Sequence, residues 1–128
     1  MKSETHMSNL KLPTMTYSNL HTLLKRSGKS RVKIAYATEI VQEPLSIAVV
    51  HHNSIIARIY SGGQPATVQV DTCGWDSMTT ASRLNKIVVD NGLPYRISIR
   101  KGDTVLMTAS LAIIAPLTTA VFREGVLI

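Results

Sequence analysis

The 128-residue sequence has a single cysteine, Cys73, and is poor in charged and aromatic residues. One cysteine excludes an internal disulfide framework and a cysteine-rich zinc or iron–sulfur site, and it is typical of a reducing compartment. Since aromatic residues make up 5% of the chain, aliphatic and β-branched side chains must fill the core. The longest apolar stretch, residues 111–122, falls short of the roughly 20 residues of a membrane-spanning helix, and the start of the chain lacks a secretory signal. We therefore expect a cytoplasmic protein that does not enter a membrane.

Patterns that support catalysis or metal binding are also lacking. His51 and His52 are adjacent and would face opposite ways in a strand, so they cannot share one metal. The Gly28-Lys29-Ser30 tripeptide lacks the first glycine of a phosphate-binding loop and follows a predicted helix instead of a strand. The acidic residues form no paired motif, and Cys73 has no histidine partner in a local signature. The sequence therefore predicts a non-enzymatic protein with no catalytic residue, no metal and no cofactor.

Positive charge is the strongest functional signal. Fourteen lysines and arginines against eight acidic residues give a net charge of +6, which attracts polyanions but also fits simple solubility. Five cations stand close together with no acid among them: Lys25, Arg26, Lys29, Arg31 and Lys33. Such a run at a helix-to-strand junction can hold phosphates by Coulomb attraction, and the alternative is a solvated helix end.

Strand alternation predicts a second basic cluster. Arg96 and Arg100 fall on one face of a predicted strand, and Lys101 extends that face. Arg58 and Tyr60 share a face of an earlier strand. Together these residues would form a basic sheet surface with one ring available for stacking, which is the arrangement that single-stranded nucleic acid favours.

Hydrophobic periodicity predicts an α+β fold with an antiparallel sheet and two helices, one N-terminal and one before the last strands. The helices are expected over residues 17–26 and 78–91, and the strands over residues 31–41, 46–51, 54–60, 66–71, 95–100, 104–110 and 118–122. A tight hairpin turn is expected at His52-Asn53, and a loop at Gly62, Gly63 and Pro65. Short turns join neighbouring strands, so we expect a sheet that helices cover on one side. Residues 1–15 are expected to be a flexible arm and residues 16–128 a single domain. Because a small open sheet exposes its edges, we also expect a homo-oligomer.

Residues 51–85 carry a recognisable combination of residues. It consists of His51-His52-Asn53, then Trp75, then Thr79-Thr80 and Arg83-Leu84-Asn85. This combination resembles a group of small bacteriophage-encoded proteins of unassigned function, with a His-x-Asn-x-x-Ala hairpin and a Trp…Thr-Thr-x-x-Arg-Leu-Asn motif. The resemblance implies a viral origin and a non-enzymatic accessory role.

The same residues also have structural interpretations. Asp76, Ser77 or Thr79 can serve as N-cap of the second helix, and Thr79 and Thr80 can cap its exposed amides. Trp75 can pack beneath the helix, and Asn85 can bridge to a neighbouring loop. The alternative is a phosphate site, made by the free start of that helix together with Arg83 one turn later. We assign these residues to the fold.

The expected function is binding of single-stranded DNA or RNA, in preference to duplex and with little sequence specificity, in phage replication, transcription or host takeover. The expected binding residues are Lys25, Arg26, Lys29, Arg31, Lys33, Arg58, Tyr60, Arg96, Arg100 and Lys101. The alternative is a phage protein that binds and inhibits or redirects a host protein. A structural component of the virion is a third interpretation.

Overall fold

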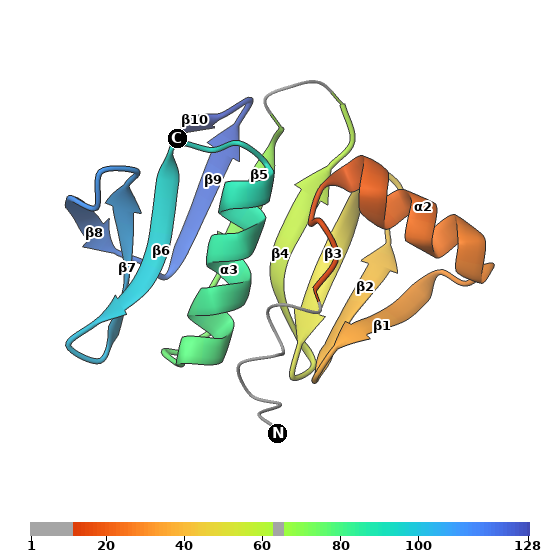
Figure 1. The fold of residues 1–128 in the computed structure, drawn as a ribbon, viewed down its shortest axis with the longest axis horizontal. Helices are drawn as coiled ribbons and strands as arrows, with labels where there is room; N and C mark the ends of the chain where they lie inside the picture. Colours follow the sequence, from red (N-terminus) through yellow and green to blue (C-terminus); the bar gives the residue numbers. More distant parts are fainter. Residues whose placement is uncertain (1–11, 63–65) are drawn as a thin grey trace.

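A computed structural model describes residues 12–62 and 66–128 of the chain. Within these residues, two helices and ten strands form two antiparallel sheets (Figure 1). In chain order the elements are α2 (Tyr17–Ser27), β1 (Arg31–Ala35), β2 (Thr38–Gln42), β3 (Ser46–His51), β4 (Ser54–Tyr60), β5 (Val68–Asp71), α3 (Met78–Asp90), β6 (Tyr95–Arg100), β7 (Asp103–Thr108), β8 (Ile113–Pro116), β9 (Thr119–Arg123) and β10 (Val126–Leu127). The predicted α+β fold is confirmed, with one helix near the start and one before the last strands. Neither helix is long and apolar enough to cross a membrane.

The strands form two sheets instead of the single sheet expected. The larger has the order β1-β2-β3-β4-β5-β9-β10, and the smaller has the order β6-β7-β8. β5 and β9 pair directly, with Asp71 opposite Thr119, although residues 72–118 separate them in the sequence. The rings of Tyr95 in β6 and Phe122 in β9 lie 5.0 Å apart and join the two sheets.

Helix α2 covers β1, β2 and β3 (Figure 1). The Thr16 side chain accepts a hydrogen bond from the backbone N–H of Asn19 and caps the start of the helix. Gly28 ends the helix with a φ of +69°, in the left-handed region that costs glycine least. The buried side chains Leu20 and Leu24 are one turn apart and hold the helix against the sheet.

Helix α3 contacts β6 and β4. Ser77 caps its start by accepting a hydrogen bond from the N–H of Thr80 at 3.2 Å. Ser77, one of the three expected N-cap candidates, is therefore confirmed, whereas Thr79 and Thr80 lie inside the helix and do not cap it. The helix ends as predicted, because Gly92 has a φ of +70° and the N–H of Leu93 donates to the carbonyl of Val88.

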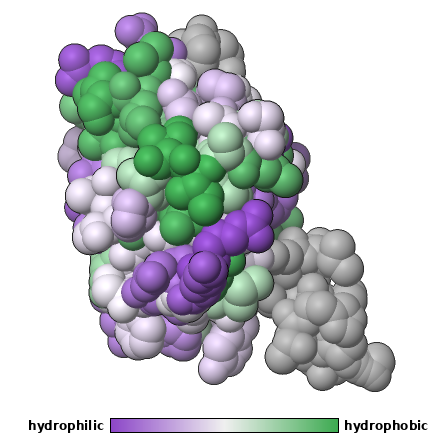
Figure 2. Space-filling model, turned by 90° about the vertical axis from the view of Figure 1, so that its left-hand side faces the viewer, coloured by the Kyte–Doolittle hydropathy of each residue, from purple (hydrophilic) through white to green (hydrophobic). Residues whose placement is uncertain are grey.

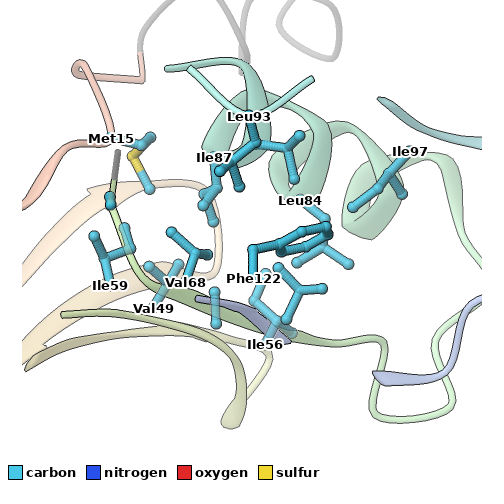
Figure 3. Close-up of a cluster of buried hydrophobic side chains, with 14 of the residues drawn as sticks. Met15, Val49, Ile56, Ile59, Val68, Leu84, Ile87, Leu93, Ile97 and Phe122 are labelled. Atoms are coloured by element: carbon cyan, nitrogen blue, oxygen red, sulfur yellow. The ribbon is translucent and has the colours of Figure 1, made fainter. Parts of the chain in front are cut away.

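The hydrophobic core lies between the helices and one face of the larger sheet. Leu84 and Ile87 of α3 point toward Ile56, Val68 and Phe122 of the strands (Figure 3). Every residue of β3 is buried, so the sheet is closely covered at its centre. Aliphatic residues make up most of this core, as the low aromatic content of the sequence predicts.

Three sequence-based expectations need correction. The strand expected over residues 31–41 is the hairpin of β1 and β2, and the short strands β8 and β10 were missed. Of the expected arm, only residues 12–15 are described, and there Leu12 and Met15 are buried. The N–H of Met15 donates to the carboxylate of Asp90 at 2.9 Å, so this segment belongs to the domain. Part of the glycine-rich loop expected after β4, residues 63–65, lies outside the described residues.

Candidate functional site

Three exposed rings meet at the end of the larger sheet where two hairpin turns lie side by side. The ring centroids of Tyr36 and His52 are 6.0 Å apart, and those of His52 and Trp75 are 5.5 Å apart. We call these three residues the ring ladder. Tyr36 is 69% exposed and Trp75 is 42% exposed, so large aromatic surfaces face solvent. The prediction that Trp75 packs beneath α3 as a buried ring is therefore wrong.

Unusual backbone conformations place the rings. Ala37 in the β1–β2 turn has a φ of +50°, and its carbonyl accepts a hydrogen bond from the N–H of His52 at 2.9 Å. His52 and Asn53 form the β3–β4 turn with φ values of +49° and +65°, as predicted for this dipeptide. Cys73 precedes Trp75 and has a φ of +53°. Non-glycine residues with positive φ thus gather around the ring ladder, and such conformations often mark functional sites.

A hollow of about 230 Å³ lies beside the ring ladder. Its lining consists of Lys33, Ala37, Thr38, Glu39, Val50, His52 and Asn53. Lys33, Glu39 and Val50 come from neighbouring positions on the sheet face turned away from the helices. The hollow therefore connects the ring ladder with that helix-free face.

A buried polar network supports the ring ladder from below. The Oγ1 atom of Thr38 accepts a hydrogen bond from Nε of Arg83 at 2.7 Å, and it lies 2.9 Å from Nδ1 of His51. Arg83 also donates from Nη2 to the carbonyl of Tyr36 at 3.3 Å. Burial, followed by the charges of Arg83 and His52, lowers the pKa of His51 to about 4. His51 is therefore a neutral, buried neighbour of the exposed His52.

The expected binding residues separate into two groups. Arg31, Lys33, Arg58 and Tyr60 share the helix-free face of the larger sheet, although Tyr60 lies at the end of β4 farthest from the ring ladder. The basic run also includes three exposed residues that precede β1 in the chain: Lys25, Arg26 and Lys29. Arg96, Arg100 and Lys101 belong to β6 and its following turn, at the opposite end of the molecule (Figure 1). The two clusters therefore do not form one basic sheet surface.

Acidic partners reduce the charge of the helix-free face. Arg31 forms an ion pair with Glu39, and Nε of Arg58 lies 3.0 Å from the carboxylate of Glu43. Hydrogen bonds from Ser46 and from Arg58 lower the pKa of Glu43, so this carboxylate is charged at neutral pH. Lys33 is the lysine in the lining of the hollow, and it is exposed on the strand position opposite Glu39.

The described segments also limit the chemistry of the site. They contain no group of three or more histidine, cysteine or acidic residues that could hold a metal ion. Burial and the carboxylate of Asp71 raise the pKa of the Cys73 thiol, which donates a hydrogen bond to the carbonyl of Ile55. The arrangement offers stacking surfaces and hydrogen-bonding groups.

Sequence reasoning missed the ring ladder as an exposed aromatic surface. Its three rings come from separate turns, so no spacing along the chain links them. The turn prediction at His52-Asn53 was the available signal, because a histidine in a tight turn projects outward from the end of a sheet.

Comparison with known proteins gives one family. Searches of curated proteins and of solved structures found no match. The model of the family described as Kyanoviridae Gp96 protein matches residues 15–126, and this confirms the expected bacteriophage origin. Because the match covers most of the sequence, the chain belongs to the Kyanoviridae Gp96 protein family.

Proposed function

We propose that this phage protein binds single-stranded nucleic acid, with bases stacked on the ring ladder and phosphates held near Lys33. The observation that carries the proposal is the group of three neighbouring exposed rings beside a hollow that contains a lysine. Base stacking on an aromatic side chain contributes about 1 to 3 kcal/mol per base and tolerates any sequence. A few stacked bases therefore supply useful affinity without base-specific hydrogen bonds.

The basic run offers a path for the phosphate backbone along β1 toward the end of α2. Lys33 lies at the hollow, Arg31 follows on the same face of β1, and Lys29 lies in the loop before it. A strand with bases on the ring ladder would follow β1 toward the end of α2, where Lys25 and Arg26 are exposed. Each phosphate neutralised along this path releases counterions, so affinity would fall as salt rises.

The alternative function, binding of a host protein, has one observation in its favour. Tryptophan and tyrosine are the residue types that most often anchor protein interfaces, and Arg31 next to the site is already paired with Glu39. Such an interface depends on shape and apolar contact, so its affinity would change little with salt. Salt dependence therefore separates the two functions.

Trp75 provides the test, because it is the only tryptophan in the chain. A base stacked on its indole would quench the intrinsic fluorescence, so oligonucleotides can be titrated without a label. We expect saturable quenching by single-stranded oligonucleotides, weaker quenching by duplex, and a fall in affinity between low and physiological salt. The absence of quenching by any oligonucleotide at low salt would contradict the proposal.

Two variants locate the site while they keep the reporter. Tyr36→Ala removes one exposed ring of the ladder, and Tyr60→Ser removes the ring at the far end of β4. We expect Tyr36→Ala to weaken binding by about 5-fold or more, since one stacked base contributes about 1 kcal/mol or more. Tyr60→Ser should leave affinity unchanged. The opposite ranking would place the strand on the Arg58 and Tyr60 surface instead.

A further inference from the structure

The hollow beside the ring ladder has the size and the walls for one flat ring. Its volume of about 230 Å³ is below the roughly 300 to 1,000 Å³ of pockets that enclose drug-sized ligands, so a single base suits it better than a whole nucleotide. Val50, which is 7% exposed, and His52 both belong to the lining. A base in the hollow would therefore contact an apolar side chain and an imidazole ring, and its polar edge would face the other lining groups.

Glu39 is the acidic residue of this lining. It lies between Lys33 and Val50 on the helix-free face, because β2 pairs with β1 on one side and with β3 on the other. The Oε1 atom of Glu39 accepts a hydrogen bond from Nε of Arg31. A carboxylate has about four lone-pair positions on its two oxygens, so this bond leaves Oε2 and further acceptor capacity. Within the part of the chain that the structure describes, Lys33 and Glu39 form no ion pair with each other, so both groups can face a ligand.

The opposite end of the molecule has a different chemistry. Figure 2 views the molecule from that end and shows apolar residues gathered across it, bordered by hydrophilic ones. Leu111 and Ile113, before and within β8, are exposed there. Residues 104–122, which run from β7 to β9, contain no acidic side chain. That segment therefore offers no carboxylate to the edge of a base, in contrast to the hollow.

A carboxylate distinguishes the bases by the donors on their edges, because an ionised carboxylate accepts hydrogen bonds and cannot donate them. Guanine carries two donor groups side by side, N1–H and the N2 amino group, and can give both to one carboxylate. Adenine and cytosine carry one amino group next to an acceptor ring nitrogen, which a carboxylate repels. Thymine and uracil carry one N–H between two carbonyl oxygens. Guanine is therefore the base that a carboxylate in the hollow favours.

We propose that the hollow is a guanine site within the surface for single-stranded nucleic acid, where Glu39 accepts hydrogen bonds from N1–H and the N2 amino group of the base. The amide of Asn53, which also lines the hollow, can donate to O6 of guanine. Lys33 remains available for a phosphate, and the ring ladder for the flanking bases. The inference rests on the proposed function and adds to it a base preference at one position of the bound strand.

Oligonucleotides that differ at one base test the inference on the unmodified protein. The probes are a thymidine oligonucleotide of about ten residues and the same strand with one central guanine or one central inosine. Affinities are measured at low salt by competition against a labelled thymidine strand, followed by anisotropy. We expect the guanine strand to bind at least about 5-fold more tightly than the thymidine strand, since guanine gives the carboxylate one more hydrogen bond than thymine. Inosine keeps the purine ring and its stacking but lacks the N2 amino group, so it should lose most of this gain.

Glu39→Gln tests the carboxylate itself, because glutamine keeps the size of the side chain but replaces one acceptor oxygen by a donor amino group. The change also releases Arg31 from its ion pair, so affinity for every strand should rise. The readout is therefore the ratio of guanine-strand to thymidine-strand affinity, which should fall to about 1. Glu43→Gln is the matched control, because Glu43 pairs with Arg58 on the same face and is absent from the lining of the hollow. It should keep the parental ratio.

The other outcomes count against the guanine site. Equal affinities of the parent protein for the guanine, inosine and thymidine strands would overturn the site and leave the proposed function standing. A guanine preference that persists in Glu39→Gln would place the discrimination on other residues and also overturn it. A parent protein that binds none of the three strands at low salt would contradict the proposed function and the guanine site together. If Glu39→Gln does not fold, the comparison of guanine with inosine on the parent protein decides.

Discussion

Arg83 of α3 donates a hydrogen bond from its Nε atom to Oγ1 of Thr38 in β2 at 2.7 Å, and both side chains are buried. The same guanidinium reaches the carbonyl of Tyr36, which begins the β1–β2 turn. The helix, the sheet and the first ring of the ladder are therefore connected by one polar network inside the molecule.

Thr38→Val tests this network. Valine keeps the shape of threonine but removes the acceptor for Arg83 and the partner of His51, so buried polar groups lose a hydrogen bond. We expect the free energy of unfolding to fall by about 1 to 3 kcal/mol, measured by urea denaturation. Thr119→Val is the control, because Thr119 is exposed in β9 and its change should fall within about 0.5 kcal/mol. Equal effects would mean that the network does not stabilise the fold.

Stability should fall on mild acidification because of His51. Its pKa is about 4 in the folded protein against about 6.5 when unfolded. Between these values the unfolded chain binds a proton that the folded protein excludes, so lower pH favours unfolding by up to about 3 kcal/mol. Above pH 6.5 the imidazole is neutral in both states and contributes no pH dependence.

Urea denaturation at several pH values between 7.5 and 4 measures this effect. His51→Asn should flatten the fall in stability. A parent protein whose stability is constant over this range would show that His51 is protonated without cost.

Trp75→Ala should separate stability from binding. The indole is 42% exposed, so its removal should cost less than the about 3 to 5 kcal/mol typical of a buried tryptophan, and the variant should remain folded. We expect its oligonucleotide affinity, measured by anisotropy of a labelled strand, to fall by about 5-fold to 150-fold. A folded variant with parental affinity would remove Trp75 from the binding surface.

The two basic clusters can be distinguished by their effect on salt dependence. Reversing Lys25, Arg26 and Lys29 to glutamate should abolish oligonucleotide binding at physiological salt, because these residues continue the phosphate path from Lys33. Replacing Arg96, Arg100 and Lys101 by alanine should leave the slope of log affinity against log salt unchanged, since they lie at the opposite end. Removing one cation that neutralises a phosphate of a single strand flattens that slope by about 0.7. The reverse result would move the site to the small sheet.

Much of the fold followed from local sequence signals. The bounds of β3, β4 and β6 were predicted to the residue, because alternation and turn chemistry are properties of neighbouring residues. The hairpin within residues 31–41 was missed because its turn consists of Tyr36 and Ala37, and neither tyrosine nor alanine is a residue type typical of tight turns. The split into two sheets depends on the pairing of β5 with β9, a long-range contact that no local pattern reveals.

The candidate site was less predictable than the fold. Composition and charge indicated a basic surface, but ion pairs such as Arg31 with Glu39 depend on register between strands. Trp75 was assigned to the interior because most tryptophans are largely buried, whereas here the Cys73-Gly74 turn directs it outward. The ring ladder is therefore a product of tertiary structure.

The direct pairing of β5 with β9 has a consequence for how the chain folds. Hairpins β1–β2 and β3–β4 close short loops, but Asp71 can meet Thr119 only after residues 72–118 have been brought back to the same place. Loop-closure entropy makes such a contact slow to form, although it adds little to the equilibrium cost. We expect β9 to join the sheet late, after α3 and the small sheet have formed. Until then β5 remains an open edge, and this is the stage at which the chain is most exposed to aggregation during folding.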